Sequence, residues 1–438
     1  MLHSHEALDR PGGGTSKLHL LSPLRHRDFR VLWTGMAVSL VGDGIFLVAM
    51  VLEALNLWNK TAALSIVGIG MTIPTILFLL PGGVVSDRFD RRIVMLCADG
   101  IRGVAVTAIA VLAFTSALRF WELVALAGLY GIGTAFFTPA FDAIVPDLLP
   151  ADDLAAANAL DQFVRPIAFR LVGPALGGIL MAASAGIAFT VDAASFVVSG
   201  IAVLMMRRPA QSRSEAPASA LGAVADGLRF VRRRVWLWGT LASAALAYLV
   251  FLGPAEVLLP YVAKNQLHAS SQAIGLVFAA GGVGAIGAAV LMAQKRHPRR
   301  DVTVMYATWT VATLAVAGYG IATAAWQLMI ACLVFNGLET AGTIVWATMK
   351  QRHVPASMLG RVSSLDWLIS IGLLPLSFAL TAPAAGLFGA RATLIGAGLL
   401  GGAITLGAFF LPGMRDIEGE PGDALARPTA SALVSTPQ

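Results

Sequence analysis

The sequence predicts an all-α membrane protein with twelve transmembrane helices, arranged as two six-helix, pseudo-symmetric bundles. Composition is the first reason. Hydrophobic residues make up 57% of the 438 residues and charged residues only 13%, whereas soluble domains carry about 25% charged residues. The other two reasons are a set of twelve long apolar runs and an internal repeat that relates the two halves.

The apolar runs place the predicted helices, because a helix needs about 20 apolar residues to cross the bilayer core. In the first half the runs cover residues 31–57, 62–84, 93–116, 121–144, 154–181 and 185–206. In the second half they cover residues 236–262, 273–294, 302–324, 326–349, 361–382 and 391–412. The runs therefore predict an N-terminal bundle over 31–206 and a C-terminal bundle over 236–412.

Three segments outside the bundles are mostly polar. Residues 1–30 are predicted to form a cytoplasmic N-terminal segment without a cleaved signal peptide, since the first apolar run is too long for one. The Arg-rich residues 207–235 predict a cytoplasmic linker with a surface amphipathic helix. Residues 413–438 are acidic and then rich in Pro, Ala and Ser, which predicts a disordered cytoplasmic tail.

The distribution of Lys and Arg predicts the orientation. With both termini inside, the outer loops carry only Lys60, Arg119, Lys264 and Arg391, and the inner loops are rich in arginine. The positive-inside rule then predicts a multi-pass protein of the cell inner (plasma) membrane, N-in and C-in. Because the basic residues lie in short loops between apolar runs, they indicate orientation and no nucleic-acid binding.

Two segments match at a spacing of 205 residues. The segment LPADDLAAANALD, residues 149–161, aligns with VPASMLGRVSSLD, residues 354–366, and each leads from an inner loop into an apolar run. Parallel repeats of six helices with a substrate site between the halves are a transporter architecture. The repeat therefore favours two equivalent bundles.

The stretch PGGVVSDRFDRRIVML, residues 81–96, places five charges in an otherwise apolar region. Its three arginines are explained by orientation, because they hold the loop inside. Its carboxylates are not, because acidic residues contribute little to orientation. The loop resembles the signature G-x-x-x-D-R-x-G-R-R of the major facilitator superfamily, beginning at Gly83 and with Asp90 at the usual glycine.

Other segments resemble the drug/proton antiporter branch of that superfamily. FTPAFDAIVPDLLP and VDAASFVVSG resemble the enterobactin exporter and macrolide efflux proteins. GPALGG resembles the second half of the antiporter motif and contains Gly173, Pro174, Gly177 and Gly178. The resemblance covers 25–412. It implies a secondary transporter without a cofactor that exports amphipathic molecules in exchange for protons by alternating access.

The resemblance also implies a conformational latch. In the superfamily, the signature aspartate, here Asp87, holds the inner end of the second helix against the start of the eleventh, here near Arg361. The positions 205 residues from this pair are Met292 and Ala156, so the acid and the cation each occur in one half only. The predicted latch comprises Gly83, Asp87, Arg88, Arg91, Arg92 and Arg361. The alternative is that these charges only fix the orientation.

Ionisable residues at membrane depth are costly and usually functional. The resemblance implies that the first, fourth, seventh and tenth helices line a central cavity. Asp43 and Glu339, on the first and tenth runs, are the leading candidates for proton coupling, and Glu53 and Glu256 are secondary candidates. The alternative is that these acids are structural and hydrogen-bonded to neighbouring helices.

Other charged residues in the apolar runs are predicted to be structural. Asp99 and Arg102 are three residues apart on one helix, a spacing at which charges can neutralise each other. Arg170 and Asp192 have no such local partner, and we expect them to pair across the fifth and sixth helices. These pairings would follow the general tendency of intramembrane charges to pair with one another.

An aromatic cavity with a few acids suits an amphipathic or cationic organic substrate. Its candidate residues are Tyr130, Phe136, Phe137, Asn336 and Trp346. The alternative for each ring is packing between helices.

The residue types argue against an enzyme and leave other membrane functions open. We find no nucleophile–base set or metal cluster, and the two cysteines have no metal-ligand spacing, so an enzyme is not expected. We expect a monomer whose partners are protons, substrate and the lipid bilayer. Alternatives on the same fold are a lysophospholipid or metabolite transporter or flippase, and a non-transporting membrane sensor.

Overall fold

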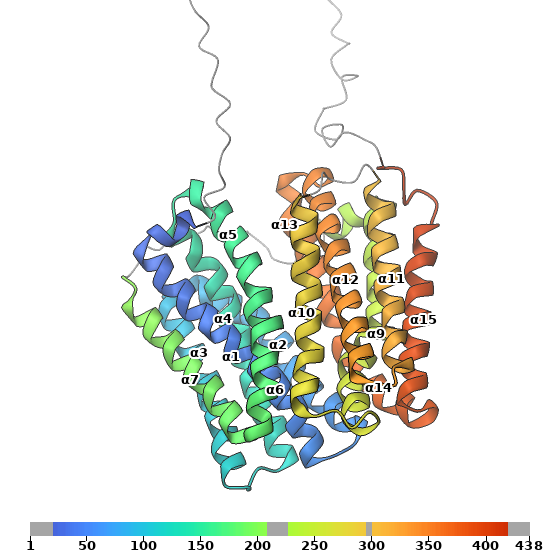
Figure 1. Cartoon of the computed structure of the whole chain (residues 1–438). Helices are drawn as coiled ribbons and strands as arrows, with labels where there is room; N and C mark the ends of the chain where they lie inside the picture. The colour runs from blue at the N-terminus through green and yellow to red at the C-terminus, as the bar shows by residue number, and fades with distance from the viewer. Residues whose placement is uncertain (1–20, 208–226, 295–299, 419–438) are drawn as a thin grey trace, which may run out of the picture.

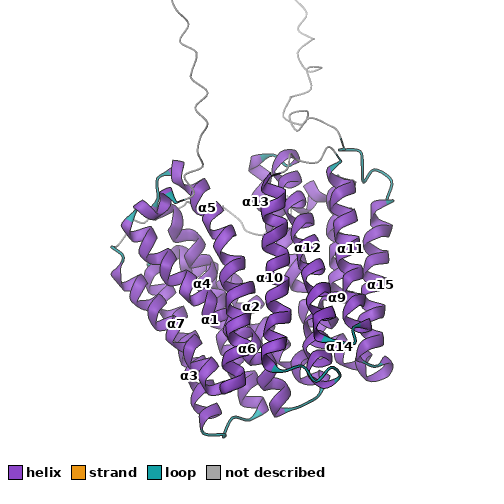
Figure 2. Ribbon diagram, in the orientation of Figure 1, coloured by secondary structure: helices purple, strands orange, loops and turns teal. Residues whose placement is uncertain are grey.

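The computed structural model describes residues 21–207, 227–294 and 300–418, and these residues form helices and connecting loops without a strand (Figures 1 and 2). The expectations for residues 1–20, for most of the linker (208–226) and for the tail beyond 418 lie outside the described residues. Residues 227–232, at the end of the expected linker, are helical.

The first half begins with a short 3₁₀ turn and continues through seven α-helices and one π-helical segment. Its elements are η1 (Ser22–Arg25), α1 (Arg27–Leu57), α2 (Thr61–Arg88), α3 (Arg91–Phe114), α4 (Phe120–Leu148), α5 (Ala151–Arg165), η2 (Pro166–Val172), α6 (Gly173–Ala183) and α7 (Ala185–Met205).

The second half repeats the pattern. Its elements are α9 (Val235–Asn265), α10 (Ser271–Gln294), α11 (Asp301–Ile321), α12 (Ala325–His353), α13 (Ala356–Gly372), α14 (Leu374–Phe388) and α15 (Ala390–Phe409).

Twelve spans in the described part of the chain are long and apolar enough to cross a membrane, which confirms the predicted number. Two of them consist of consecutive elements. Residues 156–183 join α5, η2 and α6 into one span, and residues 361–388 join α13 and α14 into another. Pro166 opens the π-helical segment, where its missing N–H disturbs the regular hydrogen-bond ladder.

The internal repeat reappears as equal spacing between helix starts. Three pairs of helices, α4 with α12, α5 with α13 and α7 with α15, begin 205 residues apart, at Phe120 and Ala325, Ala151 and Ala356, and Ala185 and Ala390. The spacing is that of the sequence repeat, and it supports the predicted pseudo-symmetry of the two halves.

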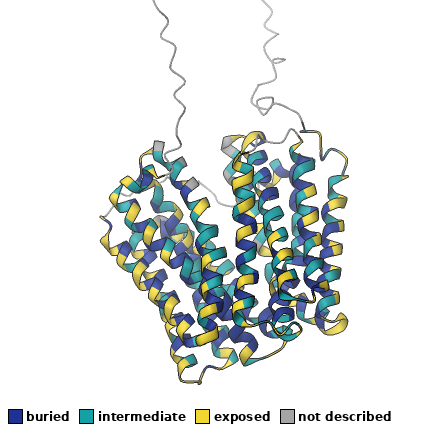
Figure 3. Ribbon diagram, in the orientation of Figure 1, coloured by how far each residue is buried: buried dark blue, intermediate teal, exposed yellow. Residues whose placement is uncertain are grey.

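The outward face of the bundles is apolar. Figure 3 shows exposed residues along the outer sides of the helices, and large side chains among them include Leu80 and Leu387, which are 81% and 79% exposed. Large contiguous apolar surfaces are rare on soluble monomers. In a bilayer the same side chains face lipid tails, so their exposure carries no such cost.

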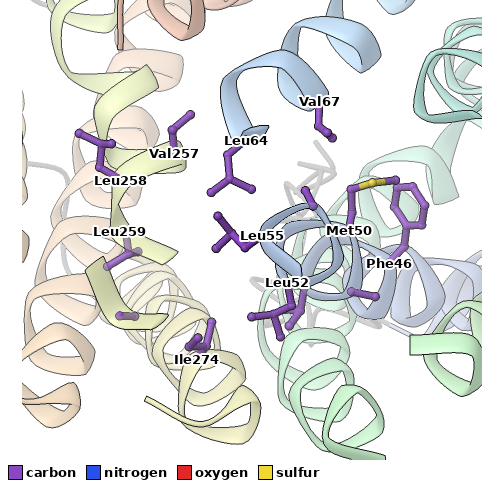
Figure 4. Packing of buried hydrophobic residues seen from close by; sticks show 14 of the residues in the cluster. Phe46, Met50, Leu52, Leu55, Leu64, Val67, Val257, Leu258, Leu259 and Ile274 are labelled. Carbon is purple, nitrogen blue, oxygen red and sulfur yellow. The ribbon is translucent and has the colours of Figure 1, made fainter. Parts of the chain in front are cut away.

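The two halves share a hydrophobic core at one end only. Figure 4 shows this shared packing, in which one buried cluster contains Leu52, Leu55 and Leu64 from the first half and Leu258, Leu259 and Ile274 from the second. At the other end, where the described chain begins and ends (Figure 1), buried clusters belong to one half each. The halves are therefore packed together at the end away from residues 21 and 418.

Candidate functional site

A buried charge cluster lies inside the N-terminal bundle. It brings together Asp43 of α1, Asp99 and Arg102 of α3, Tyr130 of α4 and Asp192 of α7. The Tyr130 hydroxyl donates a 2.6 Å hydrogen bond to Asp43 Oδ1, and Arg102 Nη1 lies 3.8 Å from Asp43 Oδ2. Arg102 also forms a hydrogen-bonded ion pair with Asp99. We call these five residues the acid cluster.

Hydroxyl groups of α7 complete the acid cluster. Ser199 Oγ donates a 2.7 Å hydrogen bond to Asp99 Oδ2, and Ser195 Oγ donates a long 3.4 Å bond to Asp192 Oδ1. Asp192 is fully buried, and its Oδ2 atom has no hydrogen-bond partner among the described residues. Asp192 is thus the least satisfied carboxyl group of the cluster.

Two aromatic rings enclose the Arg102 guanidinium. Its central carbon lies 4.3 Å from the Phe137 ring centroid and 4.7 Å from that of Phe196, within the range of cation–π attraction. Phe137, a cavity candidate from the sequence, is buried in this packing and does not line the cavity between the two halves that is described below. Tyr130 is buried as well, stacked on Phe46 with ring centroids 4.3 Å apart.

The acid cluster contains more acids than bases. Asp43 and Asp99 lie beside the Arg102 guanidinium, and Asp192 lies against Gly42 of α1 without an ion pair to a described residue. Arg165 of α5 is itself paired with Asp161. Full ionisation would leave two uncompensated negative charges in a low-dielectric interior, which costs several kcal/mol per ion. A proton on one carboxyl group reduces this cost, so the cluster is chemically suited to hold and exchange a proton.

The expected pairing of Arg170 with Asp192 is wrong. Asp192 accepts its hydrogen bond from Ser195 on its own helix, while Arg170 Nη1 donates a 3.2 Å hydrogen bond to Asn336 Oδ1 of the other half. The expectation failed because helix adjacency alone does not fix the rotation of a helix about its axis.

A cavity of about 410 Å³ lies between the two halves. Aromatic rings form much of its wall, namely those of Phe169, Tyr248, Phe251, Phe278, Tyr319 and Phe335. Its polar lining includes Arg170, Glu256, Asn336 and Glu339. Apolar walls with a few polar groups, at this volume, are typical of a small-molecule site.

Arg170 reaches the cavity from the π-helical segment η2. The wider turn of such a segment is frequent at functional sites. To the described residues, the guanidinium makes one hydrogen bond, to Asn336, whose amide nitrogen donates a 2.9 Å bond to the Cys332 carbonyl. Across the interface, Gly282 of α10 lies against the Arg170 carbonyl, so the backbones of the two halves are close at this level.

Two glutamates enter the cavity from the second half. Glu256, two residues after Pro254 on α9, is exposed to the cavity and makes no hydrogen bond or ion pair with a described residue. Glu339 on α12 accepts a 3.0 Å hydrogen bond from Thr343 Oγ1. Both were candidates from the sequence, and the structure brings them to one cavity.

The other proposed cavity residues lie in different places. Asn336 lines the cavity. Trp346 is buried and donates a 3.0 Å hydrogen bond to Asp366 Oδ2, and Phe136 packs near Phe78. The sequence analysis assigned Arg170 a structural role and did not include the rings of α9 and α10 among the cavity residues. The available signal for Arg170 was a lone arginine shortly after a proline in an apolar run.

Glu53 belongs to a contact between the halves at their joined end. Its Oε2 atom accepts a 3.0 Å hydrogen bond from Asn56, and Asn56 Oδ1 accepts a 2.6 Å bond from Lys264 of α9. This chain links α1 to α9 where the shared hydrophobic core lies. The geometry therefore places Glu53 away from Asp43 and outside the cavity lining.

The arginines of the loop signature bind within the N-terminal bundle. Arg91 is ion-paired with Asp147 and donates a 2.8 Å hydrogen bond to the Ala143 carbonyl, both on α4. Arg92 donates to the Val203 and Leu204 carbonyls at the end of α7. These bonds hold the start of α3 against two neighbours.

The remaining latch candidates are only partly described. The Asp87 side chain lies outside the described residues, Arg88 is exposed, and Arg361 Nη1 lies 3.6 Å from Met358 Sδ. At Gly83 a Cβ atom would meet nothing within 4 Å. The neighbouring Gly82 is the one that packs directly on α4, against the Ala135 carbonyl.

The GPALGG segment lies between the two halves. A Cβ atom at Gly173 would lie 2.6 Å from the Gly44 Cα atom of α1, and one at Gly178 would lie 2.9 Å from the Gly275 Cα atom of α10. Small residues permit such close helix packing in membranes. Gly177 packs on the Ile45 backbone, and Pro174 lies in the cavity wall.

In residues 21–207, 227–294 and 300–418, no group of three or more His, Cys, Asp or Glu side chains is placed to hold a metal ion.

Comparison with known proteins gives the family. A family model described as "Transmembrane secretion effector" matches residues 18–437. The chain is 24% identical to macrolide efflux protein A of Streptococcus pyogenes over 363 residues, covering 81% of this chain and 88% of that protein. It is 28% identical to the multidrug efflux pump Tap of Mycobacterium tuberculosis over 426 residues, covering 92% and 98%.

The resemblance to the enterobactin exporter is also found. The chain is 27% identical to EntS of Citrobacter koseri over 354 residues, covering 78% of this chain and 81% of that protein. These relatives are transporters and not enzymes, as predicted.

Solved structures share the fold. The nucleoside transporter NupG superposes with a TM-score of 0.62 at 10% identity, covering 87% of this chain and 97% of that one. A bacterial homologue of the iron transporter ferroportin, in an inward-facing state, gives 0.63 at 17% identity, covering 88% and 99%. The protein is therefore a multi-pass membrane transporter of the transmembrane secretion effector family, within the major facilitator superfamily.

Proposed function

We propose that the protein exports drugs or other amphipathic small molecules from the cell in exchange for protons, by alternating access and as a monomer. Its efflux-pump relatives support the export direction. The positive-inside distribution of arginines supports a position in the inner (plasma) membrane with both termini cytoplasmic.

The uneven packing of the two halves supports alternating access. With both termini inside, the shared hydrophobic core closes the outer end, and the separate clusters leave the halves apart at the cytoplasmic end. Under this proposal, the arrangement is the inward-facing state, which receives substrate from the cytoplasm. Export requires the cytoplasmic ends to approach and the outer contact at Asn56 and Lys264 to open.

The observation that carries the coupling proposal is the acid cluster, which combines three carboxyl groups with a single guanidinium, that of Arg102. Asp43 is its most accessible carboxyl group, since 13% of its side chain is exposed while Asp99 and Asp192 are buried. One turn further along α1, Leu47 lines the cavity. A proton bound at Asp43 therefore changes the charge on the same helix, α1, that lines the substrate cavity.

The other candidate residues have distinct proposed roles. Glu256 and Glu339 contact substrate in the cavity, and Glu53 stabilises the closed outer end. The GPALGG segment provides the close contact about which the halves move. Asp87 and Arg361 hold the cytoplasmic ends together in the outward-facing state, with the arginines of the same loop fixing its geometry.

The test is extrusion of a fluorescent cationic dye from an efflux-deficient bacterium that expresses the wild type or the Asp43→Asn variant. We expect extrusion by the wild type, abolished by an uncoupler and by the substitution. Asp28→Asn is the matched control, because Asp28 lies on the same helix but at its surface-exposed start, paired with Arg27.

Two outcomes would contradict the proposal. Extrusion that continues after the proton gradient is collapsed would exclude proton coupling. A wild type that moves no dye but translocates fluorescent lysophospholipid would favour the lipid transporter on the same fold.

A further inference from the structure

The central cavity contains opposite charges on opposite halves. The cation, Arg170, comes from η2 of the first half, and the two carboxylates, Glu256 and Glu339, come from α9 and α12 of the second half. Arg170 and Glu256 line the same cavity, and among the described residues no ion pair joins them.

The pairing of Arg170 differs from that of Arg91 and Arg102, whose partners are carboxylates. Arg91 is ion-paired with Asp147, and Arg102 is ion-paired with Asp99. Arg170 instead donates to the neutral amide oxygen of Asn336 and faces the cavity. A guanidinium in an apolar wall, whose one partner among the described residues is an amide, is suited to bind an anionic group, such as a carboxylate, with two parallel hydrogen bonds.

Glu256 presents the opposite chemistry across the cavity. Its carboxylate has no partner among the described residues, and the Glu339 carboxylate accepts, from those residues, one hydrogen bond, that of the Thr343 hydroxyl. Buried or enclosed charges are normally paired. A protonated amine in the cavity would supply the missing positive partner.

We propose that this cavity selects amphipathic zwitterions, with Arg170 binding the anionic group and Glu256, assisted by Glu339, binding the amine. The inference rests on the proposed transport function and specifies its substrate class. The aromatic walls hold the apolar body of the substrate, and the volume of about 410 Å³ admits a molecule of drug size.

A zwitterion would also connect the two halves. Its anionic group contacts the first half and its amine the second, so it takes the place of the direct Arg170–Asn336 hydrogen bond. A ligand shifts a conformational equilibrium only if it binds one state better than the other. A bridging zwitterion meets this condition, because both of its contacts are made only when the halves are at the right separation.

Three fluorescent probes of nearly equal size test the assignment. Nε-dansyl-lysine carries both an amine and a carboxylate, dansylcadaverine has the amine alone, and 6-(dansylamino)hexanoic acid has the carboxylate alone. Binding to the purified protein in detergent is followed by dansyl emission. We expect the wild type to bind the zwitterion at least about tenfold more tightly than either single-charge probe.

Variants of Arg170 and Glu256 test the anion-binding and the amine-binding residue separately. Arg170→Gln should weaken binding of Nε-dansyl-lysine about tenfold and leave dansylcadaverine unchanged. Glu256→Gln should weaken both amine-bearing probes and spare the hexanoic acid. Arg170→Lys should keep part of the preference for Nε-dansyl-lysine over dansylcadaverine. Arg30→Gln, at an exposed position on α1, should behave as the wild type.

The outcome does not depend on transport. Equal binding of the three probes to the wild type would overturn the assignment even if no variant folds. A loss of all three probes in Arg170→Gln with normal unfolding would assign Arg170 a structural role and would also overturn it. Selective binding in detergent without uncoupler-sensitive extrusion of Nε-dansyl-lysine from cells would leave the zwitterion site intact and refute the export proposal instead.

Discussion

The Tyr130 hydroxyl donates a 2.6 Å hydrogen bond to Asp43 Oδ1 and so joins α4 to α1 within the N-terminal bundle. The Tyr130 ring is stacked on Phe46, independently of the hydroxyl group. Removing only the hydroxyl therefore tests the hydrogen bond without disturbing the packing.

Tyr130→Phe is expected to impair proton-coupled extrusion about tenfold while the protein inserts normally. A hydrogen bond to a charged group is worth about 1.5–3 kcal/mol, and its loss changes the balance between the charged and neutral forms of Asp43. Dye extrusion measures the effect. Tyr306→Phe is the control. It removes a 3.0 Å contact between Tyr306 and Thr240, both in the C-terminal half, and should remain active.

Arg102→Gln is expected to destabilise the N-terminal bundle by about 3–5 kcal/mol, because it leaves buried carboxylates without their cation. Thermal unfolding of the purified protein measures this. The double variant Asp99→Asn/Arg102→Gln should recover part of the loss, since the two residues form one ion pair. An Arg102→Gln variant that unfolds like the wild type would contradict the assigned charge balance.

The start of α5 is expected to contribute a pH-dependent stabilisation. Ser22 Oγ and His26 Nε2 contact the Asp153 carboxylate at 2.7 and 2.8 Å. The hydrogen bond from Ser22, which has the larger effect, and the one from His26 hold the pKa of Asp153 below its usual value. Because the folded pKa is lowered, the stabilisation is present above the unfolded pKa, about 3.9, and is lost as the pH falls through the folded pKa.

Unfolding temperatures of the wild type and Asp153→Asn, measured from pH 7 downwards, test this linkage. The wild type should be the more stable at pH 7, and the difference should shrink in acid. Ser22→Ala should reproduce part of the effect. A difference that stays constant as the carboxylate is protonated would exclude Asp153 as its source.

Gly275→Ala is expected to separate the halves at their joined end. The added Cβ atom would lie 2.6 Å from the Pro174 carbonyl oxygen and 2.8 Å from Gly178 Cα, so α10 must move away from α6. A disulfide between Asn56→Cys and Lys264→Cys reports that separation, and its yield should fall several-fold. Gly287→Ala, on the same helix with no atom within 4 Å of its Cβ, should leave the yield unchanged.

Asp87→Asn is expected to lower transport with little effect on insertion, because the proposed latch loses its charge. Dye extrusion and the amount of protein in the membrane are the two measurements. Asp90→Asn is the matched control in the same loop, where asparagine can keep the N-cap bond that Asp90 makes to Arg92. Equal loss in both variants would indicate a general effect of loop charge.

Helix number and helix type followed from the sequence because they are local properties. A run of about 20 apolar residues must satisfy its backbone within the segment when it lies in lipid, and a helix does this. Helix boundaries were predicted less accurately, because helices continue into the polar residues at the membrane surface, where the apolar signal has already ended. The tenth run was predicted to end at 349, whereas α12 continues to His353.

The acid cluster was only partly predictable. The pairing of Asp99 with Arg102 followed from their spacing on one helix, and the structure confirms it. That Asp43 and Asp192 join the same cluster depends on how α1 and α7 are rotated against α3, which no local pattern records. The rotation of α4 likewise buries Tyr130 in the bundle instead of exposing it to the cavity.

The sequence by itself determined the twelve spans, the two-fold repeat and the residue types available at membrane depth. These features depend only on the lengths of the apolar runs and on the spacing between matching segments. The tertiary structure decided which of those residues meet. It placed three carboxyl groups in one cluster with Arg102 in one half, and Arg170 opposite Glu256 between the halves. Contacts between helices depend on packing and axial rotation, and these are set by the whole fold at once.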